Sequence, residues 1–276
     1  MKRIVILTGS EQRHTFLRKF LGLAEGIEVL RSFCEGWERS LEALVATEGD
    51  TPLRTRHLMN RAQSEQDFFG SFCDVVPDNS RPLFLPKGDI NLPVHTQSIL
   101  EARPDLLVLY GCSIIRDPLL SAFPGRLVNI HLGLSPYYRG SGTNYWPLVN
   151  GEPEYVGATF MYTDAGIDTG EIIHQIRARV VWGDTPSQIG NRLIIDMAYT
   201  CAHVVRRFSV VEKMPPLPAP AQLRVYRKKD FTEESVAKVY ANFAGGLVER
   251  YLAEEAGRCS RVPIVRNPAL SLQAGP

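Results

Sequence analysis

The stretch Gly125-Arg126-Leu127-Val128-Asn129-Ile130-His131 opens with glycine and continues as a short apolar run. Such a composition favours a strand buried in the middle of a sheet. Residues two apart in a strand project to the same side, so Asn129 and His131 should point together. Polar side chains on a buried strand need partners or a cleft. The alternative is that both are satisfied core residues with no role in chemistry.

Further strand-like runs precede this stretch, and helical patterns separate them. The expected strands cover Arg3–Leu7, Ile27–Phe33 and Asp105–Tyr110. Alternating strands and helices indicate parallel βαβ units. We therefore expect an α/β fold with an open, mostly parallel, Rossmann-like twisted sheet and helices on both faces. Ligands bind such sheets beyond the carboxyl ends of the strands, where Gly9, Gly111 and His131 would lie.

The remaining elements complete this plan and suggest a boundary near residue 210. Expected strands cover 155–162 and 171–181, expected helices cover 96–102 and 117–123, one or two helices fall within 35–70, and 77–91 reads as irregular. Thr185-Pro186 should open a long helix that ends near Phe208. We assign residues 1–210 to a catalytic domain and 211–276 to a linker and a small extension. That extension holds a strand-like segment at 224–229 and a helix capped by Thr232, with Gly245-Gly246 as an interruption.

Composition excludes several classes of protein. The chain has 276 residues, 44% of them hydrophobic, 22% charged, and a formal net charge of +1. These values are typical of a globular protein and point to neither a nucleic acid nor a membrane as partner. The five cysteines are dispersed without metal-ligand spacing, so we expect reduced thiols, no metal and a cytoplasmic protein. The apolar run at the N-terminus is too short for a signal peptide.

Two motifs on either side of the predicted strand 155–162 belong together. The first is Asn129-Ile-His131-Leu-Gly-Leu-Ser-Pro-Tyr-Tyr-Arg-Gly140, and the second is Asp164-Ala-Gly-Ile-Asp168-Thr-Gly170. In this order and spacing they resemble the folate-dependent formyltransferase family. The resemblance covers roughly residues 1–210 and is densest from Pro104 to Ile173. It implies 10-formyltetrahydrofolate as co-substrate and formyl transfer to an amine.

The resemblance also implies roles for three residues. Attack of a neutral amine on the formyl carbon places negative charge on the formyl oxygen, and a hydrogen-bond donor aimed there lowers the barrier. Asn129 is a pH-independent donor, whereas His131 can donate when protonated or pass a proton to the leaving nitrogen. Asp168 can accept the proton of the amine and would favour the charged form of His131.

Contacts to the co-substrate and the amine follow from the same resemblance. The segment Cys112, Ser113, Ile114, Ile115 matches family residues that face the pterin ring, although a plain strand-to-helix turn is an equal alternative. The loop Thr163, Asp164, Ala165, Gly166, Ile167 matches the segment that wraps the pterin. Tyr137, Tyr138 and Arg139 are candidates for the amine pocket, with structural aromatics as the alternative. His174 is expected to be a surface histidine.

The amine itself is not named by any motif. Gly9-Ser10-Glu11-Gln12 makes a poor phosphate loop, which disfavours glycinamide ribonucleotide. The near-neutral chain and short extension disfavour methionyl-tRNA. We therefore expect a small-molecule amine, of which a nucleotide-linked amino sugar is one example. A formyltetrahydrofolate hydrolase and a catalytically silent folate-binding module are the alternatives, and a homodimer stays open.

Overall fold

A seven-stranded sheet forms the centre of the protein. The computed structural model describes residues 1–36, 50–163, 170–220 and 223–270. The strand order is β3-β2-β1-β4-β5-β7-β8. The strands are β1 (Lys2–Gly9), β2 (Ile27–Glu35), β3 (Pro82–Leu85), β4 (Leu106–Tyr110), β5 (Leu127–His131), β7 (Gly157–Tyr162) and β8 (Ile172–Arg177). The first five pair in parallel, whereas β7 runs antiparallel to both β5 and β8. The predicted open, mostly parallel sheet is confirmed.

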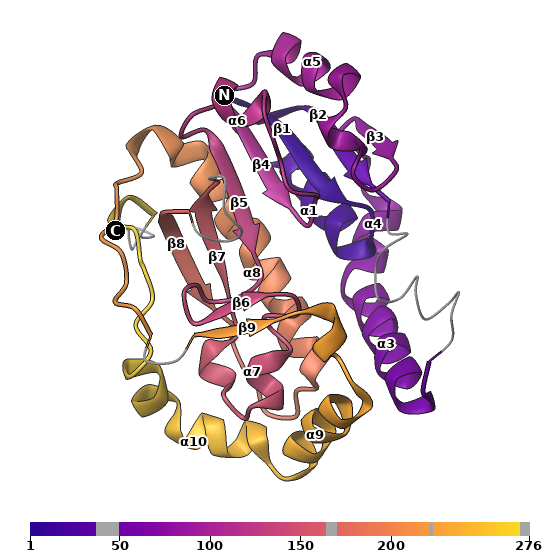
Figure 1. Cartoon of the computed structure of the whole chain (residues 1–276), viewed down its shortest axis with the longest axis vertical. Helices are drawn as coiled ribbons and strands as arrows, with labels where there is room; N and C mark the ends of the chain where they lie inside the picture. The colour runs from indigo at the N-terminus through magenta and orange to yellow at the C-terminus, as the bar shows by residue number, and fades with distance from the viewer. Residues whose placement is uncertain (37–49, 164–169, 221–222, 271–276) are drawn as a thin grey trace.

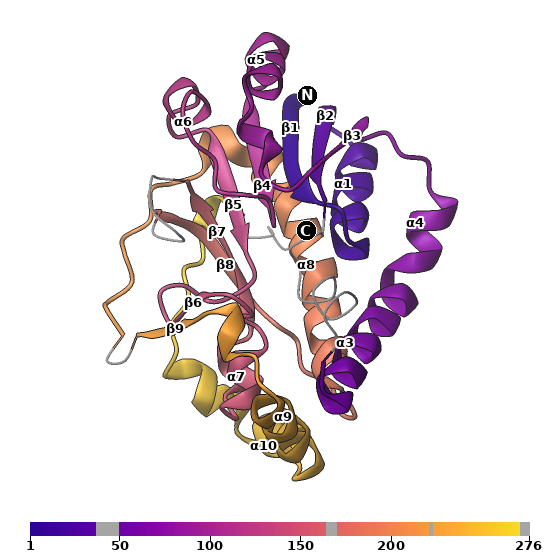
Figure 2. The ribbon, with the colours of Figure 1, turned by 45° about the vertical axis from the view of Figure 1, so that its right-hand side comes forward.

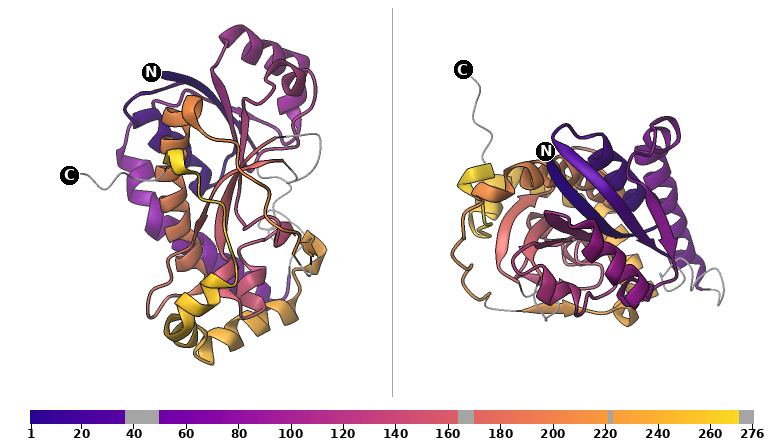
Figure 3. Two further views of the ribbon diagram at one scale, coloured as in Figure 1. Left: turned by 90° about the vertical axis from the view of Figure 1, so that its left-hand side faces the viewer. Right: turned by 90° about the horizontal axis from the view of Figure 1, so that it is seen from above.

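Helices cover both faces of this sheet, as the alternation along β1 requires. Ile4 and Ile6 belong to the larger core cluster, which holds buried residues of α1 (Gln12–Leu23) and α8 (Pro186–Arg207). Val5 and Leu7 belong to a second cluster with α5 (Pro93–Ala102) and α6 (Leu119–Ala122). Figure 3 shows the sheet edge-on, with α8 on one side and α5 on the other. Successive residues of a doubly covered strand thus enter different cores.

The long helix α8 begins where Thr185-Pro186 predicts. The Thr185 side chain accepts from the Gln188 backbone, and the Gln188 side chain accepts from the Thr185 backbone. This reciprocal capping, with proline at the first helical position, satisfies donors that a helix start leaves open. The other short elements are α3 (Pro52–Glu65), η1 (Gln66–Gly70), α4 (Ser71–Val75), η2 (Asp89–Asn91), η3 (Pro153–Tyr155), η4 (Phe208–Val210), η5 (Lys228–Asp230) and η6 (Pro268–Leu270).

One expectation for the outer parts of the sheet was wrong, and a second needs refinement. The segment 77–91 contains the edge strand β3, whose pairing with β2 begins at Pro82. Proline is tolerated at the first position of an edge strand, so local composition hid this one. His174, which was expected at the surface, is partly buried, and its Nδ1 accepts the Asn267 amide at 3.0 Å. Burial, reinforced by Arg266 and His203, lowers the pKa of His174 to about 4.

Chain beyond residue 210 packs onto the same body. A second sheet pairs β6 (Tyr138–Gly140) with β9 (Arg224–Tyr226), and α7 (Trp146–Val149) contacts α9 (Glu233–Ala244). Helix α10 (Leu247–Ser260) follows the predicted interruption at Gly245-Gly246. Figures 1 and 2 show α9 and α10 at the end of the molecule opposite α5. The domain boundary at residue 210 stays a prediction. No helix within the described ranges combines the length and apolarity that crossing a membrane requires.

Candidate active site

Asn129 and His131 occupy the second half of β5, between β4 and β7. Asn129 lies opposite Leu109 of β4 and Met161 of β7, and His131 lies opposite Thr159. Their intervening neighbours Val128 and Ile130 enter the larger core cluster, so the two polar side chains face the other side of the sheet. His131 is 8% exposed and Asn129 is partly buried. The alternation along β5 therefore places an amide and an imidazole together on one face.

The segment predicted to contact the pterin ring lies on this same face. Cys112 and Ile115 pack against the second core cluster, which also contains Leu127 of β5. Ile114, between them, is 57% exposed. Burial raises the pKa of the Cys112 thiol to about 12, which leaves it protonated and unsuited to act as a nucleophile. The segment thus presents an exposed apolar side chain and backbone groups rather than a reactive one.

The loop after His131 approaches its imidazole closely. A Cβ atom built on Gly133 would lie 2.7 Å from His131 Nε2 and 2.7 Å from Thr143 Oγ1. The Gly133 amide donates to the His131 carbonyl at 3.1 Å, and the Thr143 hydroxyl donates to the Leu132 carbonyl. Only a residue without a side chain fits at position 133 while the ring keeps this place.

Buried hydrogen bonds fix this loop to the neighbouring strands. Thr159 Oγ1 donates to the Gly133 carbonyl at 2.6 Å and accepts the Ser135 amide at 3.1 Å. Gln175 Nε2 donates to Thr159 Oγ1 at 2.9 Å and to the Ser135 carbonyl at 2.6 Å. Gln175 Oε1 in turn accepts the Val265 amide at 2.9 Å. A chain of polar contacts thus joins the C-terminal segment to the residues that follow His131.

Part of the predicted site lies outside the described residues. The residues 164–169 are not described, and they include Asp164, Ala165, Gly166, Ile167 and Asp168. The roles assigned to these five residues therefore stay predictions. Thr163 is described, and its backbone amide donates to the Leu127 carbonyl at 3.0 Å. Its hydroxyl oxygen is buried without a hydrogen-bond partner among the described residues. Thr163 therefore lies beside the start of β5.

The residues proposed for the amine pocket differ in how accessible they are. Tyr138 is fully buried, and its hydroxyl donates to Glu152 at 2.6 Å. The Tyr137 hydroxyl donates to the Pro263 carbonyl at 2.7 Å. Both geometries favour a structural role over contact with a ligand. Arg139 is partly buried, and its Nε has no hydrogen-bond partner within the described chain. Arg139 is therefore the stronger candidate of the three.

His14, to which no sequence motif points, lies where the parallel strands β1 and β4 end. A Cβ atom at either Gly9 or Gly111 would overlap its ring, so both glycines make room for it. His14 Nδ1 lies 2.6 Å from Glu11 Oε2, and burial lowers the pKa of the histidine. Burial alone would raise the pKa of Glu11, but His14 and Arg13 lower it well below its usual range. The glycines at the ends of both strands were the sequence signal that a bulky side chain lies between them.

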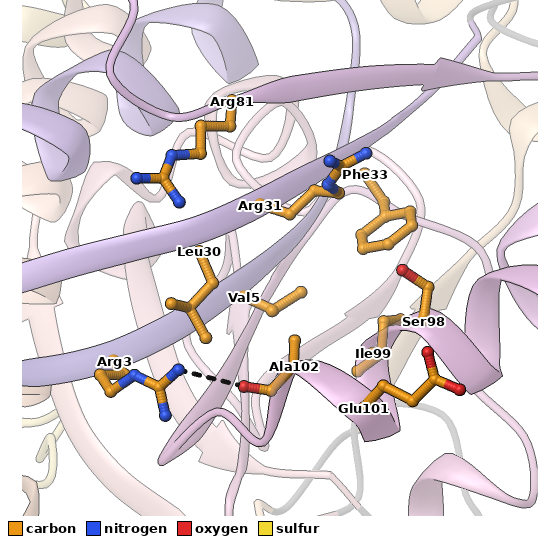
Figure 4. A pocket seen from close by; sticks show the side chains of 10 residues that line it. All are labelled: Arg3, Val5, Leu30, Arg31, Phe33, Arg81, Ser98, Ile99, Glu101 and Ala102. Atoms are coloured by element: carbon orange, nitrogen blue, oxygen red, sulfur yellow. Dashed lines mark hydrogen bonds between the residues drawn. The ribbon is translucent and has the colours of Figure 1, made fainter.

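A hollow of about 390 Å³ lies elsewhere, between α5 and the outer strands (Figure 4). Its walls include Arg3, Arg31 and Arg81, and its floor includes Val5 and Ile99. Arg3 and the end of α5 at Ala102 mark the amino ends of β1 and β4, whereas His131 ends β5. None of the predicted site residues lines this hollow, so it is distinct from the candidate active site.

Comparisons with known proteins bear on the central part of the chain. Residues 75–197 match the family model described as formyl transferase. The methionyl-tRNA formyltransferase of Desulforamulus reducens is 38% identical over 111 residues, which cover 40% of this chain and 34% of that protein. The chain thus spans about a third of the length of the curated relatives it matches.

Solved structures share the fold over a longer range. A phosphoribosylglycinamide formyltransferase from Anaplasma phagocytophilum has a TM-score of 0.54 at 14% identity, covering 82% of this chain and 98% of that one. A sugar N-formyltransferase from a Shewanella species has a TM-score of 0.52 at 16% identity, covering 83% and 78%. At these identities the likeness shows the fold alone. The match to the formyl transferase family model includes Asn129 and His131 on β5.

Proposed function

We propose that the protein transfers the formyl group of 10-formyltetrahydrofolate to a primary amine of a small molecule. The observation that carries this proposal is the placement of Asn129 and His131 on the side of β5 that also faces the segment 112–115. An amide and an imidazole at the carboxyl end of a parallel strand stand where such sheets bind ligands. The family match of residues 75–197 supports the same reaction.

The chemistry assigns each residue one task. Attack by the amine nitrogen forms a bond to the formyl carbon and moves an electron pair onto the formyl oxygen. Asn129 donates a hydrogen bond to that oxygen, a kind of contact whose loss typically costs about 100- to 1,000-fold in rate. Asp168 accepts the proton that the attacking nitrogen loses. His131 delivers a proton to the departing folate nitrogen as its bond to the formyl carbon breaks.

We also propose that the amine substrate places no phosphate group at the N-terminus of α1. Glu11 precedes the first turn of α1, and the low pKa of its carboxyl keeps it negatively charged. A carboxylate at a helix N-terminus repels the anion that such a position otherwise attracts. This charge favours an amino sugar or another small amine over glycinamide ribonucleotide. Methionyl-tRNA is the substrate named for two relatives, and the proposal does not extend to it.

The decisive experiment supplies 10-formyltetrahydrofolate with a panel of amines, including amino sugars linked to nucleotides. Tetrahydrofolate formation and the mass of the formylated amine are measured together. We expect both products in equal amounts with at least one amine. Free formate without a formylated amine would instead identify a hydrolase. Absence of any tetrahydrofolate with every amine and with water would leave a binding module as the better interpretation.

An Asp168→Asn variant tests the proton acceptor. The amide keeps the shape of the carboxylate but cannot take a proton, so turnover should fall by about 100-fold or more. Binding of tetrahydrofolate, followed by calorimetry, should persist. If the variant retains more than about a tenth of the wild-type rate, Asp168 does not have the assigned role. Asp196→Asn is the control, because Asp196 lies on α8 and pairs with the exposed Arg179.

A further inference from the structure

The loop between β4 and α6 has neither helical nor strand structure from Gly111 to Asp117, yet side chains from distant segments hold it on two sides. Lys87 Nζ donates to the Gly111 carbonyl at 3.2 Å. The Ser113 backbone amide donates to Glu35 Oε2 at 2.6 Å. Hydrogen bonds to an ionised acceptor are short and about twice as strong as neutral ones. The first half of the loop is therefore fixed to the end of β2.

Asn91 holds the second half of the same loop. Its Nδ2 donates to the Ile114 carbonyl at 2.9 Å, and its Oδ1 accepts the Arg116 amide at 2.9 Å. A single amide side chain thus satisfies a backbone acceptor and a backbone donor that no regular element would satisfy. Between these two attachments the Ile114 side chain is left 57% exposed.

Glu35 is an unusual residue to find at this position. Its side chain is fully buried at the last residue of β2, where an unpaired carboxylate would be costly. Donors on two other segments compensate its charge: the amide and side chain of Ser113, the Gly88 amide at 2.9 Å, and Lys87 Nζ at 3.2 Å. Burial alone would raise the pKa of Glu35, but Lys87 and the amide donors together lower it by more. The net pKa lies below its usual value, so the carboxyl stays ionised. An apolar residue would fill this space without that penalty, but could not hold the loop.

We infer that Glu35, together with Lys87 and Asn91, positions the loop 111–116 so that its backbone and Ile114 receive the folate ring. This inference rests on the proposed function. Glu35 touches no substrate; it acts through the Ser113 amide. Loss of the contacts made by Glu35 should weaken folate binding and leave recognition of the amine unchanged. The loop at Gly133 is fixed by a separate network through Thr159 and Gln175, and His131 is held by the pairing of β5 with β7.

The test replaces Glu35 by Gln, which has the same shape but presents either a neutral acceptor or a second donor to Ser113. Loss of a charged hydrogen bond should raise the dissociation constant of tetrahydrofolate about ten- to hundredfold. The KM for 10-formyltetrahydrofolate should rise in parallel, whereas the KM for the amine should stay within about twofold. Glu101→Gln is the matched control, because Glu101 lies on α5 and bonds only the exposed Gln97 among the described residues.

Asn91→Asp provides an independent variant if Glu35→Gln does not fold. Aspartate still accepts the Arg116 amide but no longer donates to the Ile114 carbonyl, so a rise in the same two constants is expected. Unchanged tetrahydrofolate affinity in either folded variant would overturn the inference. So would an equal rise in both KM values, which would mark a general structural role. Failure of the wild-type protein to bind tetrahydrofolate would instead overturn the proposed function.

Discussion

Gly133 shows how tightly a single residue can constrain the candidate site. The pairing of Asn129 with His131 on one face was predictable, because side chains in a strand alternate and no other information is needed. The need for glycine at position 133 was not predictable, since it depends on where the His131 ring and Thr143 come to lie. The position of His14 between Gly9 and Gly111 was not predictable for the same reason. Contacts between distant segments leave no local periodicity.

Replacing Gly133 by Ala should therefore displace the imidazole without unfolding the protein. The added methyl group would lie 2.7 Å from His131 Nε2, so the ring or the loop must move. Overpacking of this kind costs about 1–3 kcal/mol of stability. Misplacement of a reacting group by about 1 Å can cost about 100-fold in rate. Formyl transfer and thermal unfolding are to be measured together.

Gly190→Ala is the matched control, because a Cβ at this position in α8 would have no neighbour within 4 Å beyond the adjacent backbone of the helix itself. That variant should gain up to about 1 kcal/mol from helix propensity and keep full activity. A Gly133→Ala enzyme as active as the control would show that the ring position is not critical.

His174 predicts a dependence of stability on pH. Its pKa is about 4 in the folded protein, below the usual value of 6.5. Between these values the unfolded chain binds a proton that the folded protein refuses, so stability is lost as pH falls below about 6.5. The contribution is up to about 2 kcal/mol between pH 7 and pH 5.

In His174→Gln the side-chain carbonyl can still accept the Asn267 amide, but nothing titrates. The free energy of unfolding by urea should therefore fall less between pH 7 and pH 5 than in the wild type. An identical fall in both proteins would assign the dependence to other groups, of which buried His14 is the first to examine.

At the scale of elements, local sequence signals predicted the long helix α8 and the central strands better than the strand at the edge of the sheet. The capping residue Thr185 and the following Pro186 predict the start of α8. Strand β4 is apolar on both faces, and β5 is apolar on the face of Val128 and Ile130. The edge strand β3 is only four residues long and exists because β2 offers it a partner. The network from β8 through Gln175 to the loop after His131 could not be foreseen, because its members are 40 and 90 residues apart.

Gln175→Met tests whether that network positions the loop. Methionine has a similar length but makes none of these hydrogen bonds, which leaves the Ser135 carbonyl and the Val265 amide unsatisfied in the core. We expect a loss of about 2–4 kcal/mol in stability, since each unsatisfied buried group costs about 1–3 kcal/mol. Activity measured well below the melting temperature should show a lower kcat with little change in either KM. A destabilised variant with unchanged kcat would limit Gln175 to a structural role.

At the scale of the whole molecule, one hydrophobic core extends across the predicted boundary at residue 210. Val239, Val248 and Tyr251 belong to the same cluster as Ile4 and Ile130. Polar contacts reinforce this packing: Arg224 pairs with Glu152, and Arg258 pairs with Glu154 at 3.0 Å. Asn242 Nδ2 also donates to the carbonyls of Leu148 and Val149 at 2.9 Å each, at the end of α7. The composition of residues 211–276 indicated a strand and a helix, but it did not indicate which surfaces of the preceding chain these elements would cover.

A chain that ends at residue 210 should therefore fail to fold as a catalytic domain. It would expose the surfaces of α7, η3 and β6 that α9, α10 and β9 cover, and large exposed apolar patches promote association. We expect aggregation in size-exclusion chromatography and no cooperative thermal transition. A chain that ends at Leu270 keeps all of these contacts and is the control. If the shorter chain melts cooperatively and forms tetrahydrofolate at the wild-type rate, residues 1–210 are an independent domain and the C-terminal part is an accessory to it.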